Sequence, residues 1–254
     1  NLAKDRELYF LPEILEENYF LLPKSRVIFL RLFYRNGQNV VILSLAARRG
    51  RVMSAADFWN EKYQSSEYIF GKQANDFIRA VTPPACPQQT AYAPADGEGR
   101  NGVYLAAQGY QVTSTDIADL AVAKAEALAA EHQLPIKALV GDALNPPFEE
   151  ESFDLIAVCF MHFRPADNQL FMEVNQRLLK PGGLFILEGY TRDQIALKSG
   201  GPRDPEMMFS AKGLREIFAG YDLQLLQEVR RHLNEGPRHQ GEAATVQLLA
   251  RKPA

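Results

Sequence analysis

Short unbroken apolar runs alternate with longer amphipathic stretches from residue 90 to the end of the chain. Runs of this kind, apolar on both faces, are typical of strands in a parallel sheet. They predict strands at about Ala91–Pro94, Tyr110–Ser114, Ile136–Val140, Phe153–Cys159 and Gly183–Glu188. The stretches between them predict helices near Asn101–Gln108, Asp119–His132 and Asn168–Leu179. Such alternation indicates a mostly parallel sheet with helices on both faces.

The segments on either side of this alternation complete the expected fold. A helical lead-in is predicted from Ala55 to about Val81, and Gly109 and Gly182 are expected to cap helices. After a helix that starts at the N-cap Ser210, two apolar stretches predict a terminal hairpin, at Leu223–Val229 and Thr245–Ala250. The fold class is therefore α/β, a Rossmann-like, doubly wound and mostly parallel seven-stranded sheet that ends in an antiparallel hairpin.

The composition changes at Met53. Residues 1–52 carry nine Lys or Arg and five acids, a net of +4, so residues 53–254 hold −7 of the total of −3. Our leading hypothesis is that Met53 is the natural start and that the preceding stretch is read-through of upstream sequence. An Arg-rich organelle leader, an arm that pairs strands with another subunit, and a disordered tail are the alternatives. No segment reaches the ~18 apolar residues that a membrane helix needs.

Charge and cysteine content narrow the classes of partner. A net charge of −3 and a pI near 5.9 provide no basic field for a nucleic acid or an anionic membrane. The two cysteines and four histidines lack metal-ligand spacing, so we expect neither a disulfide framework nor a metal site. A reducing, cytoplasmic setting and a small-molecule partner fit best, and the oligomeric state is left open.

A glycine-rich turn follows the first predicted strand. Gly97, Gly99 and Gly102 match G-x-G-x-x-G, and such a turn brings a ligand close to backbone N–H groups at a helix N-terminus. Asp116 ends the second strand, where it can accept hydrogen bonds from a ribose or cap the next helix. Asp142 ends the third strand. Together they predict an adenosine-bearing ligand, either S-adenosylmethionine or a nicotinamide.

Five motifs resemble the successive motifs of class I S-adenosylmethionine-dependent methyltransferases. They are Gly97-Glu-Gly-Arg-Asn101, Gly109-Tyr-Gln-Val-Thr-Ser-Thr-Asp116, Gly141-Asp-Ala143, Phe153-Asp-Leu-Ile-Ala157 and Leu178-Leu-Lys-Pro-Gly-Gly183. Four further segments resemble the branch related to tellurite-resistance and thiopurine methyltransferases: Phe58-Trp-Asn-Glu-Lys-Tyr63, Tyr68-Ile-Phe-Gly71, Ser199-Gly-Gly-Pro202 and Glu235-Gly-Pro-Arg-His239. The resemblance implies a single methyltransferase domain at 53–254, with a lid at about 55–81.

The resemblance also implies a cofactor site. Gly97 and Gly99 would pass the methionine moiety, Asp116 would bind the ribose and Asp142 would face the adenine amino group. Because Ala93 stands where the family's first-strand acid is found, the carboxylate nearest the methionine amine is expected to be Asp96. The rest of the expected cofactor site is Arg100, Asn101, Ile117, Ala143 and Cys159.

The acceptor side is expected beyond the fourth and fifth strands. His162 is the candidate proton acceptor or substrate orienter, against the alternative of a loop histidine bonded to backbone. Tyr190 either closes the pocket or caps the sheet. For Arg238 and His239 a solvated loop is favoured over a place at the site. The lead-in aromatics form a lid or, equally, an amphipathic helix on the sheet: Phe58, Trp59, Tyr63, Tyr68 and Phe70.

Methyl transfer to a small molecule is thus the leading function. A nicotinamide-dependent oxidoreductase would use the same glycine turn and Asp116, but a hydride acceptor site is not evident. A non-catalytic protein that binds an adenosine ligand is the third hypothesis, because fold resemblance does not settle activity.

Overall fold

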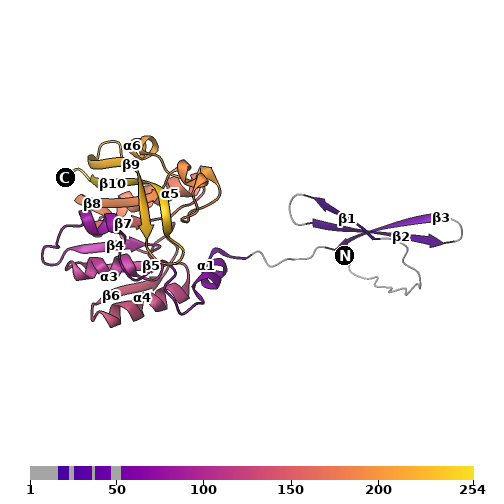
Figure 1. Cartoon of the computed structure of the whole chain (residues 1–254), viewed down its shortest axis with the longest axis horizontal. Coiled ribbons are helices and arrows are strands. Elements are labelled where there is room, and N and C mark those ends of the chain that lie inside the picture. The colour runs from indigo at the N-terminus through magenta and orange to yellow at the C-terminus, as the bar shows by residue number, and fades with distance from the viewer. Residues whose placement is uncertain (1–16, 23–25, 36–37, 47–52) are drawn as a thin grey trace. The chain divides into compact units, whose positions relative to one another are not determined.

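The computed structural model describes residues 17–22, 26–35, 38–46 and 53–254 (Figure 1). It divides into two units, Asn1–Met53 and Ser54–Ala254. The described part of the first unit is an antiparallel sheet in the order β1-β2-β3, with strands β1 (Glu17–Leu22), β2 (Arg26–Arg35) and β3 (Gln38–Ala46). The hypotheses on the origin of residues 1–52 rest largely on positions outside the described residues, and they stay predictions.

The second unit is built on a seven-stranded sheet in the order β6-β5-β4-β7-β8-β10-β9 (Figure 1). Its strands are β4 (Thr90–Pro94), β5 (Gln111–Asp116), β6 (Ile136–Val140), β7 (Phe153–Cys159), β8 (Leu179–Tyr190), β9 (Asp222–Asn234) and β10 (Gln240–Arg251). Strands β4 to β8 pair in parallel, whereas β10 is antiparallel to both β8 and β9. The predicted fold class, including the terminal hairpin, is confirmed.

Helices cover both faces of this sheet. They are α1 (Ala55–Tyr63), α2 (Asp76–Val81), α3 (Arg100–Ala107), α4 (Asp119–Glu131), α5 (Pro165–Leu178) and α6 (Ala211–Ile217), with the 3-10 turns η1 (Arg192–Ala196) and η2 (Pro205–Met207). Successive residues of β7 alternate between two cores: Ile156 packs with α5 and α6, and Leu155 with α2 and α3. Burial on both faces explains why the sequence of β7 is mostly apolar.

Two details of the expected fold are wrong. The lead-in is two helices rather than one, because α1 ends at Tyr63 and the side chain of Asn75 starts α2 by accepting a hydrogen bond from the Ile78 amide, 3.0 Å away. Gly182 is not a helix cap, since α5 ends at Leu178 and β8 begins at the next residue. Gly109 does follow α3 with a φ of +96°, as predicted.

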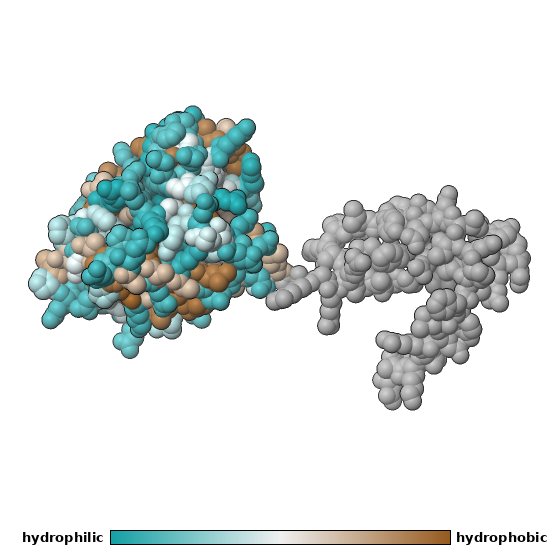
Figure 2. All heavy atoms as spheres, turned by 60° about the horizontal axis from the view of Figure 1, so that its bottom comes forward, coloured by the Kyte–Doolittle hydropathy of each residue, from teal (hydrophilic) through white to brown (hydrophobic). Residues whose placement is uncertain are grey.

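Within the described residues, none of the helices combines the length and the apolar character that a membrane span requires. The face of this unit seen in Figure 2 is mainly hydrophilic, with hydrophobic atoms in small groups between the polar ones.

Candidate functional site

A cavity of about 810 Å³ lies at the carboxyl ends of the parallel strands. Its lining comes from the segments that follow β4, β5, β6, β7 and β8, together with α1 and the turn between β9 and β10. The chain runs from β4 to β5 and β6 on one side, and then returns to β7 on the other side of β4. Such a reversal of strand order is where open α/β sheets bind ligands, and the volume suits a small molecule.

Each of the three glycines in the turn has its own structural reason. Gly97 has a φ of +60°, and its amide donates to Asp116 Oδ2 at 2.9 Å. Gly99 has a φ of +88°, and a Cβ there would lie 2.5 Å from the Cβ of Ala125 in α4. At Gly102 an added Cβ would lie 2.6 Å from Asp96 Oδ2. Gly99 therefore serves helix packing, and it is not among the residues that line the cavity; its expected place beside the methionine moiety stays a prediction.

Asp96 lines the cavity with a carboxylate that is only half satisfied. Its Oδ2 accepts hydrogen bonds from the Gly102 amide and the Ser114 hydroxyl, each at 3.0 Å. Its Oδ1 is buried and has no hydrogen-bond partner. Burial raises the pKa of Asp96 to about 7, against the lowering effect of these donors. A buried carboxylate oxygen without a partner is a place where a ligand's N–H group would be stabilised.

Asp116 ends β5 and Asp142 follows the neighbouring strand β6, and both line the cavity. Asp116 is buried, accepts from the amides of Gly97 and Ala118 at 2.9 Å, and has a pKa that burial raises. The N-cap of α4 is Ala118, so Asp116 is not the cap of that helix. Asp142 is exposed, and its Oδ1 accepts from the Leu144 amide at 2.9 Å. Beside these acids, Ile117 and Ala143 also line the cavity.

Arg100 and Asn101, at the start of α3, line the cavity and join a buried polar network. The Arg100 guanidinium lies 2.7 Å from a carboxylate oxygen of Glu235, and Asn101 Oδ1 accepts from the Asn75 amide at 3.0 Å. Burial disfavours the charge of Glu235, but Arg100 and Arg231 hold its pKa below the usual range. The network thus ties helix α3 to the end of β9.

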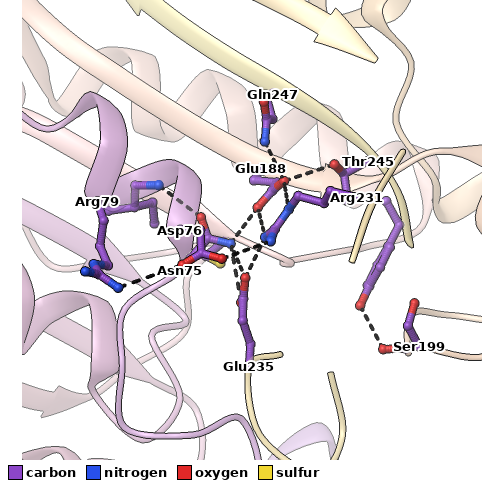
Figure 3. A network of polar contacts seen from close by, with 12 residues as sticks. Asn75, Asp76, Arg79, Glu188, Ser199, Arg231, Glu235, Thr245 and Gln247 are labelled. Atoms are coloured by element: carbon purple, nitrogen blue, oxygen red, sulfur yellow. Dashed lines mark hydrogen bonds and ion pairs between the residues drawn. The ribbon is translucent and has the colours of Figure 1, made fainter. Parts of the chain in front are cut away.

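Glu188 of β8 is the centre of that network, and it is fully buried. Arg231 donates to it through Nε at 2.8 Å and through Nη2 at 2.6 Å, while Thr245 and Gln247 donate at 2.9 Å (Figure 3). A buried carboxylate is tolerated when its charge is paired and its oxygens are satisfied. The sequence does not reveal this group, because its partners lie far along the chain.

His162 lies after β7 and lines the cavity. Its Nδ1 lies 3.0 Å from the carbonyl of Met207, and its Nε2 accepts from the Tyr190 amide at 3.0 Å. Burial lowers the pKa of His162 to about 4. Because both ring nitrogens have backbone partners, a role as proton acceptor does not fit this arrangement, and the role left to His162 is to hold the end of β8 in place.

Tyr190 and Cys159 also line the cavity, and neither is activated for proton transfer. The Tyr190 hydroxyl donates to the Ser199 carbonyl at 3.4 Å, and its ring stacks on Phe160 with centroids 4.5 Å apart. Burial raises the pKa of Tyr190 and of Cys159 far above neutrality. Arg100 Nη2 lies 3.6 Å from the Cys159 sulfur, so this thiol is a packing and hydrogen-bonding group.

Four of the five lead-in aromatics line the cavity: Phe58, Trp59, Tyr63 and Phe70. Tyr68 does not, because its hydroxyl donates to the Lys124 carbonyl at 3.0 Å, away from the lining. Helix α1 is held at the start of α4 by Asn60, which accepts from the Leu120 amide at 3.1 Å. Helix α1 and the segment after it therefore form part of the cavity lining, and α1 also packs against the start of α4.

Two lining residues were missed or misjudged from the sequence. Glu98 is buried in the glycine turn, where Lys124 lies 2.7 Å from Oε1 and the Phe70 amide donates to Oε2 at 3.3 Å. His239 is buried in the wall of the cavity, so the expected solvated loop is wrong at this residue. Arg238 beside it is exposed and lines the cavity.

Comparisons with known proteins agree with this geometry. A family model described as a methyltransferase domain matches residues 95–183, which span the glycine turn through the start of β8. No curated protein sequence matches the chain significantly.

Three solved structures illustrate the likeness of fold. A protein solved in work on the conversion of a disulfide bond into a thioacetal group during echinomycin biosynthesis has a TM-score of 0.61 and 20% identity, covering 78% of this chain and 92% of that chain. A SAM-dependent methyltransferase from Methanosarcina mazei has a TM-score of 0.56 and 17% identity, covering 71% and 99%. TehB from Haemophilus influenzae has a TM-score of 0.55 and 20% identity, covering 78% and 66%.

At these identities the structural neighbours establish a shared fold only. The indication of methyl transfer comes from the family model that matches residues 95–183. The match begins at Ala95 and contains the glycine turn, Asp116 and Asp142, which are the segments that meet at the cavity. The chain thus carries a methyltransferase domain, and it is an enzyme that uses S-adenosylmethionine as its cofactor.

Proposed function

We propose that the enzyme transfers the methyl group of S-adenosylmethionine to a small-molecule acceptor. The observation that carries this proposal is the division of the cavity into two halves. The lining carboxylates stand at or after the carboxyl ends of β4, β5 and β6: Asp96, Glu98, Asp116 and Asp142. The ends of β7 and β8 and the segments after them supply mostly apolar and aromatic residues, beside the polar His162 and Lys198: Phe160, Met161, Phe163 and Tyr190. A polar, partly cationic cofactor suits the first half and an apolar acceptor suits the second.

The residues present fit the cofactor. Asp96 Oδ1 is buried without a partner, which suits the ammonium of a methionine moiety. We assign Asp116 to the ribose and Asp142 to the adenine amino group, with Gly97 beside the methionine moiety. The remaining cofactor contacts that we propose are Arg100, Asn101, Ile117, Ala143 and Cys159. When bound, the cofactor supplies an electrophilic methyl carbon attached to a sulfonium sulfur, and loss of that methyl group leaves a neutral thioether.

The chain's own residues then have to align the acceptor and exclude water. Helix α1 brings Phe58 and Trp59 over the cavity, and both are exposed enough to close further on a ligand. His162 fixes the Tyr190 amide, and Tyr190 forms the wall beside Phe160. We propose His162 and Tyr190 as residues that shape the acceptor half rather than as acid or base.

We further propose a place near the tellurite-resistance and thiopurine methyltransferases. The motifs quoted above and the likeness to TehB support this placement. Both cysteines are free thiols, which supports a reducing, cytoplasmic location.

The net charge of −7 over residues 53–254 supports a small molecule over RNA or DNA, because a negatively charged domain disfavours the approach of a phosphate backbone. The test is a panel of thiols, halides, chalcogen oxyanions, phenols and small amines, read by release of S-adenosylhomocysteine. We expect turnover of at least one class. Failure of every class, together with tight and salt-sensitive RNA binding, would contradict the proposal.

A further inference from the structure

His239 sits at a fixed point of the cavity wall, at the end of the turn between β9 and β10. Its carbonyl accepts from the Glu235 amide at 2.8 Å, and its amide donates to the Gly236 carbonyl at 3.1 Å. The turn is packed against the loop before α2, because a Cβ on Gly236 would lie 2.2 Å from the Gly71 nitrogen. The backbone of His239 is therefore held in place by the turn itself, which fixes the point from which the imidazole extends.

The imidazole of His239 is surrounded by aromatic rings that also line the cavity. Ring centroids lie 4.5 Å away for Phe70, 4.6 Å for Phe160 and 5.8 Å for Tyr190. The residue is 6% exposed, and its Nδ1 is buried with no hydrogen-bond partner. A buried polar atom without a partner costs about 1–3 kcal/mol, so its retention in a ligand cavity points to a partner that the ligand brings.

The second histidine of the lining gives the contrast. Both nitrogens of His162 are bonded to backbone, at 3.0 Å each, so a ligand cannot use them. Among the lining residues that the structure describes, His239 is thus the histidine with a nitrogen left to offer.

The charges around His239 keep it neutral. Burial, and next the nearby Arg100, lower its pKa to about 3, while Glu235 opposes them. A neutral imidazole presents a lone pair on one nitrogen. That lone pair complements an N–H, O–H or S–H donor on the acceptor. A cationic acceptor is disfavoured, because the charged residues lining this half are Lys198 and Arg238.

We propose that His239 accepts a hydrogen bond from the reacting N–H, O–H or S–H group of a flat, uncharged and largely apolar acceptor, which stacks among Phe70, Phe160 and Tyr190. This inference rests on the proposed function and names its substrate class. In the transfer, the acceptor heteroatom forms a bond to the methyl carbon as the carbon–sulfur bond breaks, and the electron pair of that bond stays on sulfur. The heteroatom's proton passes along the hydrogen bond to the lone pair of His239, and the imidazole releases it to solvent when the product leaves.

The test uses Trp59, the single tryptophan of the chain, as a reporter in the cavity. With S-adenosylhomocysteine bound, Trp59 fluorescence is titrated with 4-propylphenol and with 4-propyltoluene, in which a methyl replaces the hydroxyl at similar size. The ratio of the two dissociation constants measures the hydrogen bond. We expect His239→Phe to reduce the preference for the phenol about tenfold relative to the unsubstituted enzyme.

Two further variants make the outcome decisive. His239→Gln, whose amide oxygen also accepts a hydrogen bond, is expected to keep much of the preference. His232→Gln is the matched control, since His232 is exposed and pairs with Glu242 outside the cavity lining. An unchanged ratio in His239→Phe, an equal loss in both His239 variants, or no quenching by either probe would overturn the inference. Calorimetric binding of S-adenosylhomocysteine is measured in parallel, and its failure would count against the proposed function instead.

Discussion

The ionisation of Asp96 sets up a measurable conflict between folding and cofactor binding. Its carboxyl group ionises near 3.8 in the unfolded chain, but burial raises the pKa to about 7 in the folded protein. The folded state therefore holds a proton that the unfolded state has lost between these values, and stability falls as the pH rises through that window. A shift of about three pH units, at ~1.4 kcal/mol each, corresponds to about 4 kcal/mol at neutral pH and above.

Asp96→Asn removes the charge and keeps the shape. The amide oxygen can still accept from the Gly102 amide and the Ser114 hydroxyl, which both bond Oδ2 in the native protein. We expect the variant to be more stable than the native enzyme by up to about 4 kcal/mol near pH 8, and the gain to vanish near pH 4. Urea unfolding across this range measures it. Cofactor affinity should fall at least about tenfold, because the methionine ammonium loses its carboxylate.

The matched control is Asp154→Asn. Burial disfavours the charge of Asp154, but bonds from Lys180 and Thr90 dominate and lower its pKa. Its contribution to stability is present above about pH 4 and is lost below the lowered value, so this variant should be less stable than the native enzyme at neutral pH. The reasoning is refuted if Asp96→Asn is destabilised near pH 8, or if its gain does not change with pH.

Three further substitutions test separate parts of the site. Gly99→Ala should cost about 2 kcal/mol or more in thermal unfolding, because φ is +88° and the new Cβ would meet Ala125; an unchanged melting temperature would contradict the packing role. Glu188→Gln should lower the free energy of unfolding in urea by about 3–5 kcal/mol, since Arg231 loses a buried charge partner. A decrease of less than about 1 kcal/mol would contradict this role of Glu188. Asn60→Ala should speed hydrogen exchange in α1 while leaving the β8 amides unchanged, and equal protection in α1 would exclude Asn60 as its anchor.

The strands, and the meeting of three aspartates at one cavity, could be predicted from the sequence for physical reasons. Strands β6 and β7 match their predicted bounds. For β7 the reason is that a strand buried on both faces leaves an apolar run in the sequence. Asp96, Asp116 and Asp142 were placed together because parallel strands bring their carboxyl ends to one edge.

What the sequence concealed depends on contacts between distant segments. Glu188 looks like the end of an apolar strand, and only the fold brings Arg231 and Gln247 to it. His239 lies between Arg238 and Gln240, a polar setting typical of a solvated turn, yet the turn docks on the loop at Gly71 and buries the ring. Local pattern carries no signal for such docking.

The measurement that bears most directly on the central claim is a crystal structure of the enzyme with S-adenosylhomocysteine. We expect the adenosyl group beside Asp116 and Asp142, with its sulfur facing the half of the cavity lined by Phe160 and His239. Density for the ligand outside this cavity, or in the aromatic half with the carboxylates left free, would contradict the account.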